Sequence, residues 1–168
     1  MLLDTDVFSF LMKPGDTRAS LYKKHVDGKI IAVSFVTVGE LLFGAEKKKW
    51  GAAKQNNLNG RLKSVVVVPY DRELCATYAR TKALVQESGK PVSDNDLWIA
   101  ACAIRHGIPL VSHNRKHFAH IPGLVLISEQ VVADQLQSQE SLNLVESDTS
   151  VSSAPLRPTS LSSALSED

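Results

Sequence analysis

The sequence predicts an α/β fold with a central, mainly parallel sheet, and two observations carry this prediction. Short, almost wholly apolar runs rich in β-branched residues recur along the first 128 residues. Stretches with helical spacing of apolar residues separate these runs. Apolar runs of this kind are typical of strands in a parallel sheet whose two faces are covered by helices. Strands that alternate with helices therefore indicate an α/β protein.

Five segments have the character of buried strands. Four of them cover residues 1–4 (MLLD), 29–34 (KIIAVS), 65–70 (VVVVPY) and 108–112 (IPLVS), and a weaker one covers 124–128 (LVLIS). Each run is short, and β-branched residues are frequent in most of them, as expected for a strand rather than a long helix.

Three helices are predicted between these strands. The first covers residues 34–49 and ends in three lysines, which the helix dipole favours there. The second is capped by Asp71, runs to about Glu87 and is broken by the Ser-Gly-Lys-Pro segment at 88–91. The third is capped by Ser93 and ended by the pair at 106–107, His-Gly.

The chain changes character after residue 128, which predicts one domain over 1–128 and a disordered, Ser-rich acidic tail over 129–168. The tail has ten serines, seven acidic residues, one basic residue and no aromatic residue. Because the whole 168-residue chain has a net charge of +1, the first 128 residues carry +7. A basic domain favours a polyanionic partner, although a solvated surface explains the same charge.

The remaining composition points to a cytoplasmic protein. The hydrophobic fraction is 43%, no apolar run reaches 18 residues, and no basic segment precedes an apolar core at the start of the chain. We therefore expect no membrane span and no signal peptide. Cys75 and Cys102 both lie in apolar, helix-like stretches, which predicts two reduced and buried thiols.

Acidic side chains occur where the predicted elements end or begin. Asp4 and Asp6 follow the first strand, Glu40 lies near the start of the first helix, and Asp94 and Asp96 open the third. Ligands of parallel sheets bind at the carboxyl ends of strands, so these acids can form one anionic pocket. Oxygen ligands without His or Cys spacing favour Mg²⁺ or Mn²⁺, which can activate water against a phosphate.

Capping gives two of these acids an alternative, purely structural role. Thr37 and Glu40 have the spacing of a capping box, and Ser93 and Asp96 have a weaker form of it. We expect no such role for Asp4, because no helix is predicted directly after it. Asp4 is therefore the strongest candidate for a functional acid.

Three segments resemble the PIN-domain ribonucleases, particularly the VapC toxins of bacterial toxin–antitoxin pairs. They are residues 2–7 (LLDTDV), 34–41 (SFVTVGEL) and 95–101 (NDLWIAA), the last of them followed by HGIPLV at 106–111. The order and spacing of these segments match the family through about residue 127. The resemblance implies a PIN-like, three-layer α/β/α fold.

The resemblance also implies a function and a set of site residues. Asp4, Glu40 and Asp96 would be the acidic site that holds Mg²⁺ or Mn²⁺, with Thr5 as a hydroxyl partner beside Asp4. The implied activity is endonucleolytic cleavage of RNA. The implied partners are the RNA substrate, a small antitoxin that occupies the site, and a second copy in a homodimer.

The sequence departs from the family at the fourth acidic position. Family members often carry another acid in the segment that matches 112–118 (SHNRKHF), where this chain has none. Asn114 and His117 are the candidates to replace it, and His117 also fits an exposed polar residue. Because the chain has one negative charge fewer here, the number of metal ions at the site, one or two, stays open. Arg115 and Lys116, in the same loop, are candidates to position RNA, and so is Thr5.

Two other functions remain open at this point. Asp4-Thr5-Asp6 is similar to the paired aspartates of haloacid-dehalogenase-like phosphatases, but Phe8 does not fit that pattern and Glu40 would have no role. The missing fourth acid also fits a degenerate PIN-like module that binds RNA or protein without cutting.

Overall fold

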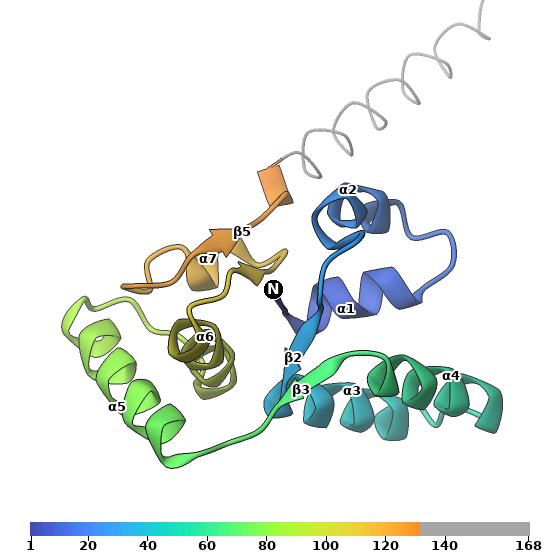
Figure 1. Cartoon of the computed structure of the whole chain (residues 1–168), viewed down its shortest axis with the longest axis horizontal. Helices are drawn as coiled ribbons and strands as arrows, with labels where there is room; N and C mark the ends of the chain where they lie inside the picture. Colours follow the sequence, from blue (N-terminus) through green and yellow to red (C-terminus); the bar gives the residue numbers. More distant parts are fainter. Residues whose placement is uncertain (132–168) are drawn as a thin grey trace, which may run out of the picture. The chain divides into compact units, whose positions relative to one another are not determined.

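The structure is a computed structural model that describes residues 1–131, and its centre is a five-stranded sheet in the order β3-β2-β1-β4-β5 (Figure 1). All neighbouring strands are parallel. The strands are β1 (Leu2–Leu3), β2 (Ala32–Ser34), β3 (Val66–Val68), β4 (Leu110–Val111) and β5 (Leu126–Ile127). The chain thus builds the sheet outwards from β1 in one direction and then, from β4, in the other.

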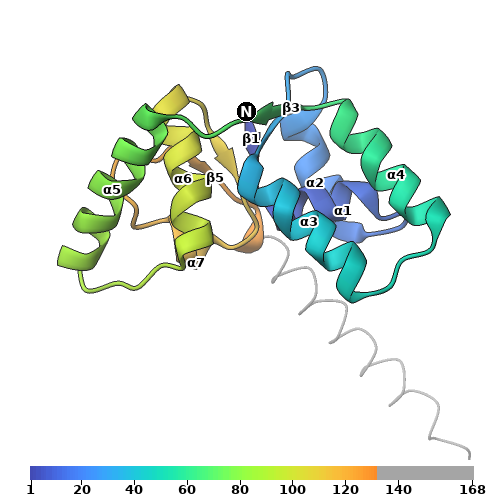
Figure 2. The same cartoon turned by 90° about the horizontal axis from the view of Figure 1, so that it is seen from below.

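Helices cover both faces of this sheet (Figure 2). One group lies against one face: α1 (Thr5–Met12), α2 (Thr17–Val26), α3 (Phe35–Lys47) and α4 (Ala52–Lys63). The other group lies against the opposite face: α5 (Arg72–Glu87), α6 (Asp94–His106) and the single turn α7 (Arg115–Phe118). The predicted three-layer α/β/α architecture is confirmed.

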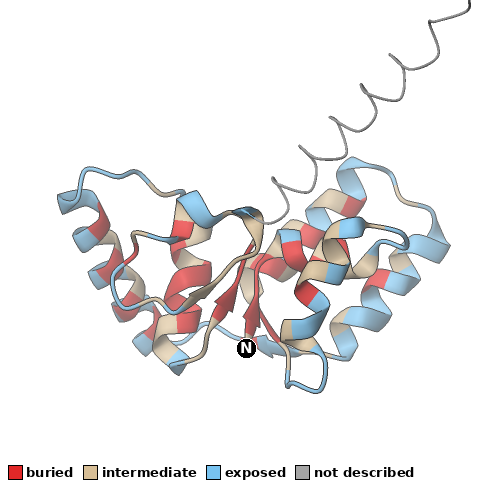
Figure 3. Cartoon of the chain, turned by 90° about the horizontal axis from the view of Figure 1, so that it is seen from above, coloured by how far each residue is buried: buried red, intermediate tan, exposed pale blue. Residues whose placement is uncertain are grey.

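Alternation along the short strands divides the core into two. Successive side chains of a strand point to opposite faces. Leu2 accordingly packs with the α5–α6 side, and its neighbour Leu3 packs with the α1–α4 side. Leu110 and Val111 on β4 divide in the same way. The central strands are therefore buried on both faces, as Figure 3 shows, which explains their unbroken apolar sequence.

The predicted elements are confirmed, and the strands are shorter than expected. All five strands lie within the predicted segments, and Asp71 and Ser93 cap α5 and α6 through their side chains. Gly107 ends α6 with a φ of 60°, a left-handed conformation that glycine adopts without strain. Four helices were not predicted, namely α1, α2, α4 and α7.

The cysteine prediction is half wrong. Both thiols are free, and Cys102 is buried in α6 as expected, but Cys75 is exposed on α5. Burial raises the pKa of the Cys102 thiol to about 12. Only one of the two cysteines therefore acts as a core residue.

Glu129 ties the end of the described chain to α2. Its backbone N–H donates to the hydroxyl of Tyr22 at 3.1 Å. Its carboxylate lies 2.6 Å from His25 Nε2 and 3.1 Å from Lys24 Nζ. These two side chains, His25 above all, lower the pKa of Glu129. The predicted disordered tail beyond this contact falls mostly in residues 132–168, outside the described residues.

Candidate active site

The carboxyl ends of the three central strands each carry a polar side chain. Asp4 directly follows β1, Ser34 ends β2 and Ser112 directly follows β4, and all three are buried. The backbone N–H of Asp4 donates to the carbonyl oxygen of Val111 at 3.0 Å, which joins two of these strand ends. The strand order reverses at β1, and ligands of α/β sheets bind at such a switch point.

Asp4 is the buried acid of this edge, with 5% of its surface exposed. Its carboxylate accepts hydrogen bonds from the Thr5 backbone N–H at 2.8 Å and from the Ser112 hydroxyl at 2.7 Å. Burial raises the pKa of Asp4 to about 6, although these hydrogen bonds oppose the shift. The negative charges of Asp6 and Asp96 raise it further.

Asp4 also caps α1, so the expectation that it has no helix to cap was wrong. The helix begins at the very next residue, directly after the strand predicted over residues 1–4. Capping explains the hydrogen bond to Thr5 but not the burial of a carboxylate whose donors are both neutral. Asp6, in the first turn of α1, is exposed and contributes only its charge.

Glu40 meets the start of two other helices. Its two carboxylate oxygens accept hydrogen bonds from the Thr5 hydroxyl and, at 2.7 Å, from the Asn95 side-chain amide. The capping alternative for Glu40 was wrong, because Ser34 is the cap of α3 and accepts from the Thr37 N–H at 2.9 Å. Thr5 thus links Asp4 to Glu40, which follows Thr5 by 35 residues in the sequence.

Asp96 faces the loop that follows β4. Its backbone N–H donates to Ser93 Oγ at 3.2 Å, while its carboxylate lies 3.0 Å from His117 Nδ1. The neighbouring Asp94 is exposed and pairs with Lys82 at 2.7 Å, away from these contacts. Only one of the two acids that open α6 therefore joins the others.

The loop after β4 brings Asn114 and His117 to Asp96. The Asn114 side-chain amide nitrogen lies 2.7 Å from His117 Nδ1, and its backbone N–H donates to Ser112 Oγ at 3.0 Å. The sequence made His117 one candidate to replace the missing acid, with an exposed polar residue as the alternative, and in the structure it contacts Asp96 directly. Its place in the segment that lacks the family's acid was the signal.

Arg115 and Lys116 form the exposed start of α7, next to this cluster in the chain. The Arg115 backbone N–H donates to the Gln130 side chain at 3.0 Å. Two cations beside an acidic edge are suited to an anionic substrate that the acids alone would repel.

The donor set suits a hard divalent cation. Asp4 has only neutral donors on its buried carboxylate, and the nearby charges of Asp6 and Asp96 repel it. A cation bound by carboxylate oxygens would offset that repulsion, and Mg²⁺ and Mn²⁺ prefer such ligands. Within residues 1–131, however, no three His, Cys, Asp or Glu side chains already converge as a finished metal site. The carboxylates contact side-chain donors instead.

Comparison with known proteins identifies the family. The model of the PIN domain matches residues 1–124, so the chain belongs to the PIN domain family. Within that family it is of the VapC type, as two curated relatives illustrate. It is 29% identical to ribonuclease VapC2 of Haemophilus influenzae, over 73% of this chain and 92% of that protein. It is 32% identical to the VapC ribonuclease Y4jK of Sinorhizobium fredii, over 70% and 89%.

Solved structures agree with this assignment. The VapBC2 complex of Rickettsia felis bound to a promoter DNA fragment matches with a TM-score of 0.65 and 26% identity, covering 76% of this chain and 96% of that one. The VapBC-1 structure from nontypeable Haemophilus influenzae gives a TM-score of 0.65 and 27% identity, with the same coverage. The alternative of a haloacid-dehalogenase-like phosphatase is wrong, because the family is a different one.

Proposed function

We propose that this protein is a divalent-metal-dependent endoribonuclease and the toxin of a toxin–antitoxin pair. The observation that carries the proposal is the gathering of Asp4, Glu40 and Asp96, through their contacts, at the carboxyl edge where the strand order reverses. Its relatives support the reaction, since they are named as VapC ribonucleases, and one is named a tRNA(fMet)-specific endonuclease.

The acidic residues would hold Mg²⁺ or Mn²⁺, which activates water and polarises the scissile phosphate when bound. The surrounding side chains orient these acids. Thr5 and Asn95 each hold one carboxylate oxygen of Glu40, and Ser112 fixes one oxygen of Asp4. Such support limits the rotation of the ligands and so lowers the entropy that binding must overcome.

The loop after β4 would position the substrate. Arg115 and Lys116 can neutralise phosphates on either side of the bond to be cut, because their cationic ends are exposed beside the acidic edge. Asn114 presents a side-chain amide at the same place. Ser112 connects this loop to Asp4, so substrate contact and the acidic site share one hydrogen-bonded unit.

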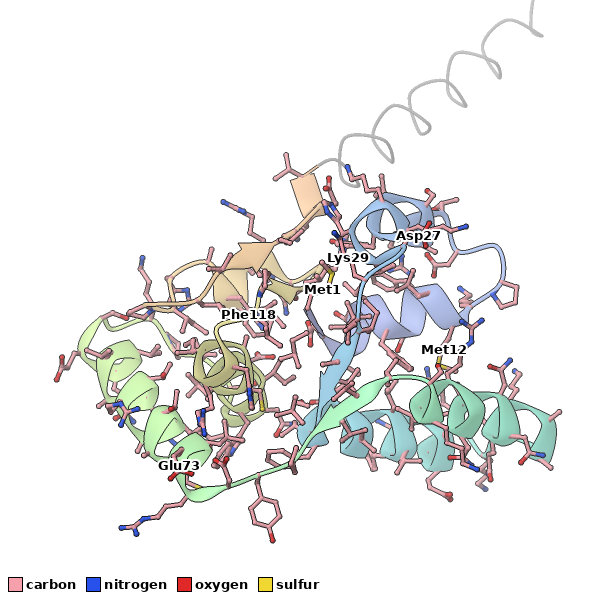
Figure 4. The ribbon with its side chains drawn as sticks, in the orientation of Figure 1. Met1, Met12, Asp27, Lys29, Glu73 and Phe118 are labelled. Carbon is pink, nitrogen blue, oxygen red and sulfur yellow. The ribbon has the colours of Figure 1, made fainter. Side chains whose placement is uncertain are left out.

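A groove on the α1–α4 side of the sheet supports the proposal that the chain binds an acidic protein partner. It has a volume of about 920 Å³ and opens beside the edge strand β3, where Val66 is 53% exposed. Met12, Asp27 and Lys29, which lie on its wall, are labelled in Figure 4. Its rim is mainly basic, with Lys23, Lys29, Arg61 and Lys63 against the single acid Asp27.

The partner of this proposal is a small antitoxin with an acidic, partly apolar segment, and solved relatives are themselves VapBC complexes. The proposal also includes that the toxin forms a homodimer and that it acts in the cytoplasm. In the part of the chain that the structure covers, no helix is long and apolar enough to cross a membrane. If the adjoining reading frame encodes such an antitoxin, its product should bind the wild type and bind an Arg61→Glu variant more weakly.

Cleavage of RNA by the full-length chain tests the activity. Labelled tRNA and single-stranded RNA are incubated with Mg²⁺ or Mn²⁺, and fragments are separated on gels. The wild type should cut, while Asp4→Asn and Asp96→Asn should lose cleavage, as should the wild type in a chelator. Asp27→Asn is the matched control, because Asp27 is an exposed acid at the C-terminal end of α2, and this variant should cut normally.

Absence of cleavage by the wild type under all these conditions, with RNA binding intact, would replace the proposal by the degenerate PIN-like binding module. Cleavage that is equal in the wild type and in Asp4→Asn would contradict the assigned site. Arrest of bacterial growth on expression, relieved by Asp4→Ala, would separate a toxin from a nuclease of another role.

A further inference from the structure

Three lone-pair-bearing groups meet at the start of α6 and α7. His117 Nδ1 lies 3.0 Å from Asp96 Oδ2 and 2.7 Å from the side-chain amide of Asn114. The Asn114 backbone is fixed by its N–H bond to Ser112 Oγ, which in turn donates to Asp4. The cluster therefore adjoins the candidate active site through a chain of short contacts.

Hydrogen bonds do not satisfy this cluster while the Asn114 amide nitrogen faces His117. A single ring nitrogen carries either one proton or one lone pair. If Nδ1 of His117 donates to Asp96, the N–H of Asn114 points at another donor. If Nδ1 accepts from Asn114, its lone pair faces the lone pairs of the carboxylate. Either way, one contact is unfavourable.

A reversed Asn114 amide turns the conflict into a ligand set. The two ends of an asparagine amide have the same shape, so their assignment depends on their partners. With the oxygen in place of the nitrogen, an Nδ1 that carries a proton donates to both oxygens. An Nδ1 without that proton completes three lone pairs, from Asp96, His117 and Asn114, at separations of 2.7 and 3.0 Å, and a bound cation would take the place of the proton. Adjacent ligands of an octahedral ion with bonds of about 2.1 Å lie about 3 Å apart.

We propose that His117 Nδ1 ligates the divalent cation of the candidate active site together with Asp96 and Asn114, so that the site prefers Mn²⁺ to Mg²⁺. Mg²⁺ takes oxygen ligands almost exclusively, whereas an imidazole nitrogen favours transition metals. Mn²⁺ is the transition metal that also suits carboxylate and amide oxygens. His117 lies in the segment that lacks an acid, and it replaces a charged ligand by a neutral one.

The inference rests on the metal site of the proposed function but is tested without RNA. The metal-stripped, full-length protein receives one equivalent of Mn²⁺, and pulsed electron paramagnetic resonance records coupling of the ion to nitrogen-14. Dissociation constants for Mn²⁺ and, by competition, for Mg²⁺ come from the signal of free Mn²⁺. The variants are His117→Ala and His117→Glu.

His106→Ala is the matched control, because His106 is exposed at the far end of α6, ten residues from Asp96 and so about 15 Å along the helix. The wild type and the control should show nitrogen coupling, and both His117 variants should lose it. His117→Glu should still bind Mn²⁺, but its preference for Mn²⁺ over Mg²⁺ should fall about tenfold or more.

Wild-type protein that binds Mn²⁺ without nitrogen coupling, or that binds no Mn²⁺, overturns the inference. So does coupling that persists in His117→Glu, which restores a carboxylate and keeps the test valid if His117→Ala is unfolded by circular dichroism. Coupling of Mn²⁺ to nitrogen in a protein that does not cleave RNA would contradict the proposed function and leave the role of His117 as a ligand in place. Cleavage without coupling would remove only the role of His117.

Discussion

Replacing Asp4 by asparagine should make the protein more stable at neutral pH while it abolishes the proposed activity. In the native state the pKa of Asp4 is about 6, against 3.8 for an ordinary aspartate. The native state therefore holds a proton more tightly than the unfolded state. As pH rises from about 3.8 to about 6, the free energy of unfolding falls, and the full cost of the buried charge is present above pH 6.

The size of this effect follows from the two pKa values. Their difference, at 1.36 kcal/mol for each pH unit, gives about 3 kcal/mol. Asp4 is 5% exposed, so solvent screens little of this cost. Asparagine has nearly the same shape, its oxygen can still accept from the Thr5 N–H, and it carries no charge. We expect Asp4→Asn to gain up to about 3 kcal/mol at pH 7.5 and almost nothing at pH 4.

Urea unfolding monitored by circular dichroism, in a chelating buffer at several pH values, measures the gain. The exposed Asp27→Asn serves as a control that should change the free energy of unfolding by less than about 0.5 kcal/mol at every pH. In a second series without the chelator, added Mn²⁺ should stabilise the wild type more than Asp4→Asn, since a bound cation offsets the same charge. An Asp4→Asn variant that is destabilised equally at pH 4 and pH 7.5 would refute the reasoning.

Two further predictions concern stability. Phe118→Ala should lower the free energy of unfolding by about 3–5 kcal/mol, because this ring is 1% exposed and fills the α6–α7 side of the core; a loss as small as that of Phe43→Ala, where the ring is 65% exposed, would contradict this. Ser34→Ala should cost about 0.5–2 kcal/mol by removing the cap of α3. Thermal unfolding would show it, and a cost no larger than that of Ser20→Ala, at an exposed position in α2, would argue against the cap.

The parts of the fold that could be predicted are those whose burial requires a recognisable pattern of apolar residues in the sequence. Strands covered on both faces must be apolar almost throughout, so the buried strands within residues 29–34 and 108–112 were readable. Helices α2 and α4 were not, because each buries a single residue, Tyr22 and Leu58, and so leaves no apolar stripe to detect. Helix α1 was hidden because it starts directly after β1 inside one apolar run.

The acidic residues that the structure brings together could be selected from the sequence, but most of their hydrogen bonds could not. Asp4 and Asp96 stand at ends of elements and Glu40 lies in the second turn of α3, and such positions near helix starts are visible in sequence. The hydrogen bond from Ser112 to Asp4 spans 108 residues, and the contact between His117 and Asp96 depends on how one turn of helix is placed after β4. No periodicity encodes such contacts, since they arise only when the sheet brings strand ends together.

The contacts of Glu129 have a practical consequence for anyone who shortens this chain. A protein cut after residue 128 would lose both the backbone donor to Tyr22 and the carboxylate between Lys24 and His25. The same helix, α2, contributes Lys23 to the wall of the groove proposed for the antitoxin. A shortened protein that keeps residues 1–131 retains these contacts of Glu129. Its effect on growth and its partner binding can then be compared with those of the full-length chain while α2 keeps its contacts.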